Sequence, residues 1–181
     1  MTAIVREATG EFLYSIHGAP DVVALNTPKG CLAVDEAPDV GMYYLGGKWN
    51  YIQPAPGEGH VFDYNSHTWL DVRTLSDVRA AHWNRLKSIR DQLEFGGFEY
   101  NGNIYDSDQV SQGRIMGAAL AGVDQVWTTA DNSTVSLTGA ELLELYQALQ
   151  AHIASVHERS RTARLAVEGA TTKEEVESIS L

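Results

Sequence analysis

The distribution of proline constrains the fold of this 181-residue chain more than any other feature. All five prolines lie in its first third: Pro20, Pro28, Pro38, Pro54 and Pro56. Proline fixes φ and has no N–H to donate, so it interrupts helices and central strands. After Asp71 the apolar residues recur at helical spacing. The chain is therefore predicted to be α+β, with a small β-rich module of antiparallel hairpins over residues 1–72 and a mainly helical module with short β-hairpins over residues 73–181.

Two hairpins are predicted in the first module. Met42–Ile52 places aromatic and aliphatic residues on either side of a Gly-Gly pair, which readily adopts positive φ. His60–Val72 has apolar residues around an Asn-Ser turn. The segment "QPAPGEG" between them cannot continue a strand and is expected to be a connector. The expected product is a small meander whose aromatic side chains form a core.

The second module is predicted to alternate helices with short hairpins. Helices are expected over Leu75–Leu93, from about Val110 to Gly122, and from Thr138 to about Ala166, with a short helix at the end of the chain. Hairpins are expected at residues 98–105, turning at Asn101-Gly102, and at residues 126–137. The longest helix carries an apolar stripe that repeats every three or four residues.

The stretch "YNGNIYDSDQVSQGRI" has two interpretations, because Asp106 and Asp108 flank Ser107. A calcium loop would need further oxygen ligands at fixed spacings and a closing glutamate, which this stretch lacks. A helix start needs only a carboxylate that accepts an unpaired N–H of the first turn, and a Gln three residues after Asp106 completes a capping box. The helix start is the favoured interpretation.

Four residues are predicted to be helix N-caps because each precedes an apolar helical pattern. They are Ser76, Asp106, Thr138 and Thr172, with Thr171 as an alternative to the last.

Composition limits the classes of function. The formal net charge is −11 and the pI is about 4.8, which disfavours a nucleic-acid-binding surface. The single cysteine, Cys31, can form no intramolecular disulfide or thiolate metal site, and it lies in an apolar setting that favours an inert thiol. No signal peptide and no apolar run long enough to span a bilayer are visible. We expect a chain folded in a reducing cytoplasm, without membrane insertion.

The histidines invite a metal hypothesis, because His60, Asp63 and His67 lie close in sequence. Side chains alternate along a strand, so His60 and Asp63 would point to opposite faces of a hairpin. His152 and His157 are five residues apart on the long helix and are expected to be surface or partner contacts. No nucleophile elbow and no phosphate-binding glycine loop is present. We therefore predict no catalytic residue, no metal ligand and no cofactor.

Aromatic residues are the strongest candidates for binding a partner, because large amphipathic rings dominate interface energetics. Trp49, Tyr64 and Trp69, all in the β-rich module, are predicted to be partner-binding anchors.

Several blocks of the helical module resemble, in order, a domain of unknown function carried at the C-termini of phage tail and tail-fibre-associated proteins. They are the helix with Trp83 and "IRD", then "GGFEYNGNIYDSD", "SQGRIMGA", "VWTTADNSTVSLT", the long helix and "RTARLAVEGATTKEEVESI". The N-terminal third is more loosely similar to tail-fibre assembly proteins, through "GGKW" at Gly46–Trp49 and the Pro-containing link and aromatic hairpin of Pro54–Trp69. The resemblance implies a role in a phage tail and implies no catalytic residues.

Three functional hypotheses follow. The first is a non-enzymatic bacteriophage tail component that contacts tail-fibre or baseplate proteins. The second is a tail-fibre assembly chaperone that acts in the host cytoplasm and is absent from the virion. The third is a small metal-dependent enzyme that uses His60, Asp63 or His67. The sequence leaves the copy number and homo-oligomerisation open.

Overall fold

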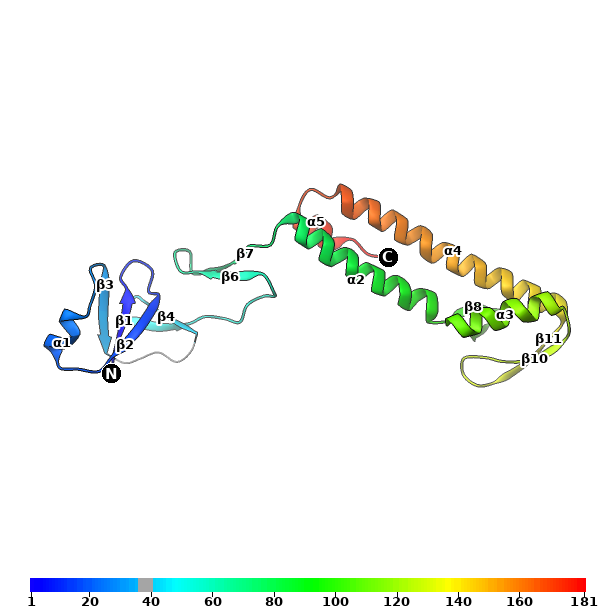
Figure 1. Ribbon diagram of the computed structural model, residues 1–181, viewed down its shortest axis with the longest axis horizontal. Helices are drawn as coiled ribbons and strands as arrows, with labels where there is room; N and C mark the ends of the chain where they lie inside the picture. Colours follow the sequence, from blue (N-terminus) through cyan, green and yellow to red (C-terminus); the bar gives the residue numbers. More distant parts are fainter. Residues whose placement is uncertain (36–40) are drawn as a thin grey trace. The chain divides into compact units, whose positions relative to one another are not determined.

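The computed structural model describes residues 1–35 and 41–181, and the chain divides into two compact units, Met1–Arg73 and Thr74–Leu181 (Figure 1). The first unit contains short antiparallel hairpins and the second is mainly helical. The α+β fold class and its distribution along the chain are therefore confirmed. The division lies one residue beyond the predicted boundary.

A three-stranded antiparallel sheet forms the first part of the N-terminal unit. Strand β1 (Thr2–Arg6) lies between β2 (Phe12–Ile16) and β3 (Cys31–Asp35). Ala3, Ile4 and Val5 of the central strand are fully buried. Between β2 and β3 the chain forms a short helix, α1 (Pro20–Leu25), which the proline-rich sequence did not suggest. It is compatible with Pro20 because a proline at the first helical position loses no hydrogen bond.

Two hairpins complete this unit. Strands β4 (Met42–Leu45) and β5 (Lys48–Tyr51) form one, and β6 (His60–Asp63) and β7 (Thr68–Asp71) form the other. Each is a separate two-stranded sheet, so the expected single meander is wrong in its hydrogen bonding. An isolated two-stranded hairpin is marginal in water, so these hairpins depend on side-chain packing.

The helical unit is organised along α4 (Gly139–Gly169). Helix α2 (Leu75–Phe95) and helix α3 (Gln109–Ala121) lie end to end beside it (Figure 1). Helix α2 runs antiparallel to α4, because its first turns pack near Val167 and its end reaches His152.

Shorter elements connect and close the helical unit. The hairpin of β8 (Phe98–Tyr100) and β9 (Asn103–Tyr105) separates α2 from α3. The hairpin of β10 (Gln125–Thr128) and β11 (Thr134–Leu137) separates α3 from α4. The short helix α5 (Lys173–Ser178) packs back against α2.

The buried face of α4 spans two clusters of apolar side chains. One cluster joins α4 to α3 and the hairpins, and it contains Phe98, Tyr105, Ile115, Ala118, Leu137, Leu142, Leu145 and Leu149. The other joins α4 to α2 and α5, and it contains Val78, Leu86, Ala163, Val167 and Val176. The buried positions on α4 recur at helical spacing, so one face of a single helix contributes to both clusters.

Two of the predicted helix caps are wrong. The N-cap of α2 is Thr74 rather than Ser76, because Thr74 is followed three residues later by Asp77, whose carboxylate accepts the Thr74 N–H at 3.1 Å. The N-cap of α3 is Asp108 rather than Asp106. Its carboxylate accepts the N–H groups of Val110 and Ser111 at 2.9 and 3.2 Å.

The remaining two helices begin where the sequence places them. Thr138 caps α4 and Thr172 caps α5, each in a capping box with a glutamate three residues later.

Gly113 gives a test of the exposed face of α3. A Cβ there would meet no atom within 4 Å, and glycine in a helix interior costs about 1 kcal/mol relative to alanine. We expect Gly113→Ala to raise the free energy of unfolding by about that amount, measured by urea denaturation. Gly122→Ala is the control and should lower the free energy of unfolding. Gly122 ends α3 with φ at 62°, a conformation that alanine adopts only with strain. Destabilisation by Gly113→Ala would contradict the exposed helical position.

Candidate functional site

Aromatic side chains link the two hairpins of the N-terminal unit. Tyr43 stacks on the His67 ring at 4.6 Å between centroids and lies 5.8 Å from Phe62. Phe62 in turn meets Tyr64 and Trp69 edge to face, at 5.1 and 5.5 Å. The expected aromatic core is present, and it joins hairpins that share no ladder hydrogen bonds.

Two of the three predicted anchors, Tyr64 and Trp69, are part of this packing, and Trp49 packs on other aromatic rings. Trp69 is half-buried and donates its indole N–H to the carbonyl oxygen of Gln53 at 2.9 Å. Trp49 is half-buried between Phe12 and Tyr44, with ring centroids 6.4 and 5.2 Å away. Tyr64 is half-buried against Phe62. A partner would therefore meet only the edges of these rings.

The outward face of β6–β7 is apolar and exposed. Val61 and Leu70 lie directly opposite each other in the hairpin register, while Phe62 and Trp69 form the next pair on the other face. The exposed fractions are 54% for Val61, 47% for Leu70 and 59% for Val72. We call these three residues the β6–β7 face. A hairpin that is apolar on both sides buries one side in its own unit and leaves the other for a contact.

The sequence contains the signal for this face, although the prediction missed it. In "HVFD" and "TWLD" the apolar residues are consecutive rather than alternating. Because neighbouring side chains on a strand point to opposite faces, both sides of such a hairpin must be apolar. The large aromatic residues drew the prediction to the side that packs internally.

The residues of the metal hypothesis have other partners. His60 Nδ1 lies 3.1 Å from the Gly57 carbonyl oxygen, and His67 Nε2 lies 3.1 Å from the Thr9 carbonyl oxygen. The Asp63 carboxylate accepts hydrogen bonds from Asn65 and Ser66 within its own turn. Within residues 1–35 and 41–181, no three His, Cys, Asp or Glu side chains are grouped so that they could hold a metal ion.

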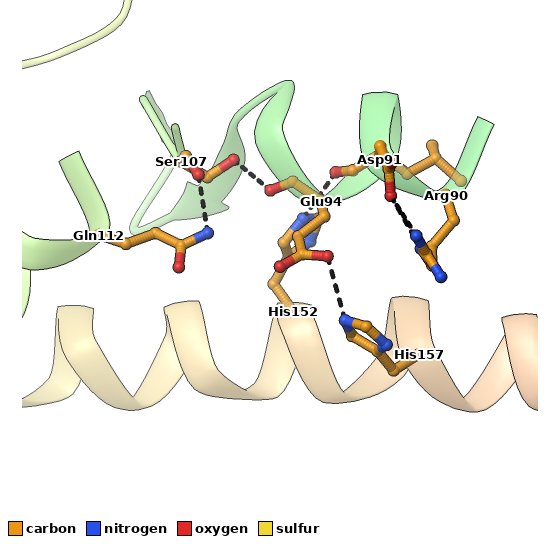
Figure 2. Close-up of polar contacts among 8 residues, drawn as sticks. Arg90, Asp91, Glu94, Ser107, Gln112, His152 and His157 are labelled. Atoms are coloured by element: carbon orange, nitrogen blue, oxygen red, sulfur yellow. Dashed lines mark hydrogen bonds and ion pairs between the residues drawn. The ribbon is translucent and has the colours of Figure 1, made fainter. Parts of the chain in front are cut away.

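A cluster of polar side chains surrounds the end of α2 in the helical unit (Figure 2). Ser107 is fully buried; its hydroxyl donates to the Glu94 carbonyl oxygen at 2.6 Å and accepts the Gly97 N–H at 2.9 Å. The Gln112 side-chain amide donates to the Ser107 carbonyl oxygen at 2.9 Å. Ser107 thus ties the end of α2 to the start of α3, which explains why the helix cap falls on Asp108.

Two histidines of α4 reach the same end of α2 (Figure 2). His152 Nε2 lies 2.9 Å from the Leu93 carbonyl oxygen, and because a carbonyl only accepts, this nitrogen donates. His157 Nε2 lies 3.0 Å from the Glu94 carboxylate. Both histidines therefore contact α2 within their own unit. The expectation of a surface position is wrong for half-buried His152 but holds for His157, whose side chain is 42% exposed.

The chemistry of this cluster is helix capping. The last carbonyl groups of a helix have no intrahelical partner, and here His152 and Ser107 supply donors to two of them. At the other end of α2, Arg79 donates to the Ala170 carbonyl oxygen and buried His82 lies 2.9 Å from the Ile179 carbonyl oxygen. The hydroxyl of Ser107 already uses its proton and accepts a backbone N–H, so it is not poised as a nucleophile.

Comparison with known proteins assigns the helical unit to a family. Residues 77–180 match a family described as Domain of unknown function (DUF4376), and the chain belongs to this family. The match covers nearly all of the helical unit and none of the N-terminal unit. No curated protein and no solved structure matched the chain. Over the described part of the chain, every helix is too short or too polar to cross a membrane.

Replacing Ser107 tests the junction between α2 and α3. Ser107→Ala leaves the Gly97 N–H and the Glu94 carbonyl without their buried partner, and we expect a loss of about 2 kcal/mol in the free energy of unfolding. Ser88→Ala is the matched control, because Ser88 is exposed on α2 and only bonds back to the Asn84 carbonyl of its own helix. Equal effects of the two substitutions in urea denaturation would rule out the proposed role of Ser107.

The lowered pKa values of two carboxylates in turns predict that the stability of the protein falls at acid pH. Hydrogen bonds from Ser66 and Asn65 lower the pKa of Asp63 from 3.8 to about 2, and hydrogen bonds from Thr129 and Ser133 do the same for Asp131. Because the folded pKa lies below the unfolded one, these carboxylates stabilise the native state above about pH 3.8, and that contribution is lost as the pH falls to about 2. NMR titration of the carboxyl carbons should give both values near 2. Values near 3.8 would mean that these turns do not hold their carboxylates in solution.

Proposed function

We propose that this member of the DUF4376 family is a non-enzymatic component of a bacteriophage tail, which contacts tail-fibre or baseplate proteins mainly through the β6–β7 face. The observation that carries the proposal is the exposure of Val61, Leu70 and Val72 on one side of a hairpin whose other side is packed. Contiguous apolar surface of this kind is typical of protein–protein contacts.

The assignment to a phage tail rests on sequence resemblance. The helical module is similar in block order to domains at the C-termini of phage tail proteins, and Gly46–Trp49 and Pro54–Trp69 are similar to tail-fibre assembly proteins. The second resemblance falls on the β4–β5 hairpin and on the β6–β7 hairpin, and the latter carries the β6–β7 face. Contact with a fibre is therefore the interaction that both lines of support favour.

A tail-fibre assembly chaperone is the alternative, and the similarity of the N-terminal third to tail-fibre assembly proteins favours it. The two proposals share the contact surface and differ in whether the chain stays in the virion. Quantitative mass spectrometry of purified particles separates them. A stoichiometric amount relative to the fibre protein supports a tail component, whereas presence in infected cells and absence from particles supports a chaperone.

Leu70→Glu tests the β6–β7 face. A charge placed in an apolar contact is desolvated without a partner, so we expect at least about tenfold weaker binding to the fibre or baseplate protein of the same phage. The measurement is isothermal titration calorimetry with purified partner. Leu25→Glu is the matched control, because Leu25 is 88% exposed on α1 of the same unit.

Circular dichroism of both variants checks that the fold is retained, since both positions are exposed. Equal affinity of Leu70→Glu and the unmodified chain for the partner would exclude the β6–β7 face as the contact. Failure of the unmodified chain to bind either class of tail protein would exclude the proposed function itself.

A further inference from the structure

We propose that the groove between α3 and β10 binds an extended peptide segment of a partner protein, which pairs as an added strand with the free edge of β10 and places an acidic side chain against Arg114. This site lies in the helical unit and is separate from the β6–β7 face, so it goes beyond the proposed function. It stands or fails independently of which phage protein contacts the N-terminal unit.

The groove consists of two adjoining hollows of about 340 Å³ each. Both are lined by Arg114, Gln125 and Trp127, so they form one continuous depression. Helix α3 forms one wall and β10 forms the other. Arg114 is exposed and lines both hollows.

The alternation of backbone groups shows which edge of β10 is free. Thr129 donates its N–H to Ser133, across the hairpin, at 2.9 Å. Backbone groups point to alternate sides along a strand, and the register from Gln125–Leu137 to Thr128–Thr134 has no irregularity. The N–H and C=O groups of Val126 and Thr128 therefore point away from β11.

The neighbouring contact of Ala130 supports this direction. Ala130 continues the alternation of Val126 and Thr128, and it donates its N–H to the Ile104 carbonyl oxygen of β9 at 2.9 Å. Beyond that contact the chain after β9 turns into α3, and the groove lies between α3 and β10. The outward edge of β10 thus faces the groove, where an added strand would find unused donors and acceptors.

Charge indicates the chemistry of the occupant. The charged residues lining the two hollows are Arg114 and Asp106. Within the described ranges Arg114 makes no hydrogen bond and no ion pair. Its positive charge helps to lower the pKa of Asp108, after the hydrogen bonds that the Asp108 carboxylate accepts from Ser111 and Val110 at the helix cap. An exposed guanidinium in the lining of a groove, with no hydrogen bond among the described residues, fits a carboxylate side chain.

The shape of the groove fits one extended segment. Gly117 lines the wall of α3 and has no heavy atom within 4 Å of a Cβ built on it, so the wall is open at this point. Val126 on the opposite wall is 71% exposed and supplies apolar contact for alternate side chains. Because α3 flanks the free edge, a single strand fits more readily than the folded hairpin of a second copy.

The test uses a short capped peptide of alternating valine and threonine with one central glutamate, titrated into the full-length, isotope-labelled protein and followed by amide NMR. We expect saturable shifts of the Val126 and Thr128 amides and of α3 amides next to the groove. The same peptide with a central lysine should bind about tenfold more weakly, because it places a like charge against Arg114.

Two substitutions of the same kind on α3 provide the matched comparison. Gly117→Leu fills the groove, whereas Gly113→Leu places the same side chain on the same helix outside the lining of the two hollows. Neither leucine Cβ would meet a heavy atom within 4 Å, so both variants should fold, as an unchanged dispersion of amide signals would show. Binding should be lost in Gly117→Leu and kept in Gly113→Leu.

Three results would overturn the inference. The first is the absence of peptide-induced shifts at Val126 and Thr128 at millimolar peptide. The second is equal binding of the glutamate and lysine peptides. The third is a set of Val126 and Thr128 shifts that depends on protein concentration without peptide and disappears in Gly117→Leu, which would assign the groove to a second copy of this chain.

Discussion

The burial of one face of α4 is the interaction on which the helical unit depends. A 31-residue helix is held in water mainly by packing, because its local propensity alone gives marginal stability. Leu142, Leu145 and Leu149 are fully buried against α3 and the hairpins, and Ala163 and Val167 are buried against α2 and α5. Each fully buried leucine contributes about 1.5–3 kcal/mol. One helix therefore contributes residues to two clusters that have no member in common. Helices α2 and α3, which the β8–β9 hairpin separates, must both pack against α4.

That interruption explains the polar residues of the unit. Where α2 ends beside α4, its last carbonyl groups need hydrogen-bond donors. Ser107, in the segment just before α3, donates to one of them, and His152 of α4 donates to another. His82 and Arg79 have the equivalent role for carbonyl groups after α4 and α5. The Ser107 hydroxyl and the imidazoles of His82 and His152 thus contact backbone groups. Two surfaces are proposed to bind partners: the β6–β7 face, where apolar side chains are exposed, and the groove between α3 and β10, where the outward backbone groups of β10 make no hydrogen bond among the residues described.

The sequence predicted the elements better than the contacts between them. Helical spacing and turn residues located α2, α3, α4 and four hairpins, because those signals are local. Thr138 was found as a cap because Glu141 follows it by three residues, and Thr172 was one of two adjacent threonines predicted to cap the last helix. Ser76 and Asp106 were wrong because neighbouring Thr74 and Asp108 compete for the same role, and buried Ser107 decides the second case through Glu94 and Gly97. The choice of Trp49, Tyr64 and Trp69 as anchors could not anticipate that their rings pack on other aromatic side chains of the same unit, namely Phe12, Tyr44 and Phe62. Those contacts depend on the three-dimensional arrangement of the strands.

Hydrogen–deuterium exchange of the full chain, alone and with the tail-fibre protein that is proposed as its partner, tests the central claim most directly. The claim is that this protein acts through surfaces left exposed by a fold whose polar side chains cap its own helices. The account predicts new protection of the amides of residues 60–72 in the complex, and unchanged exchange around Ser107, His152 and His157. Protection centred on that polar cluster, with residues 60–72 exchanging as they do in the free chain, would contradict it.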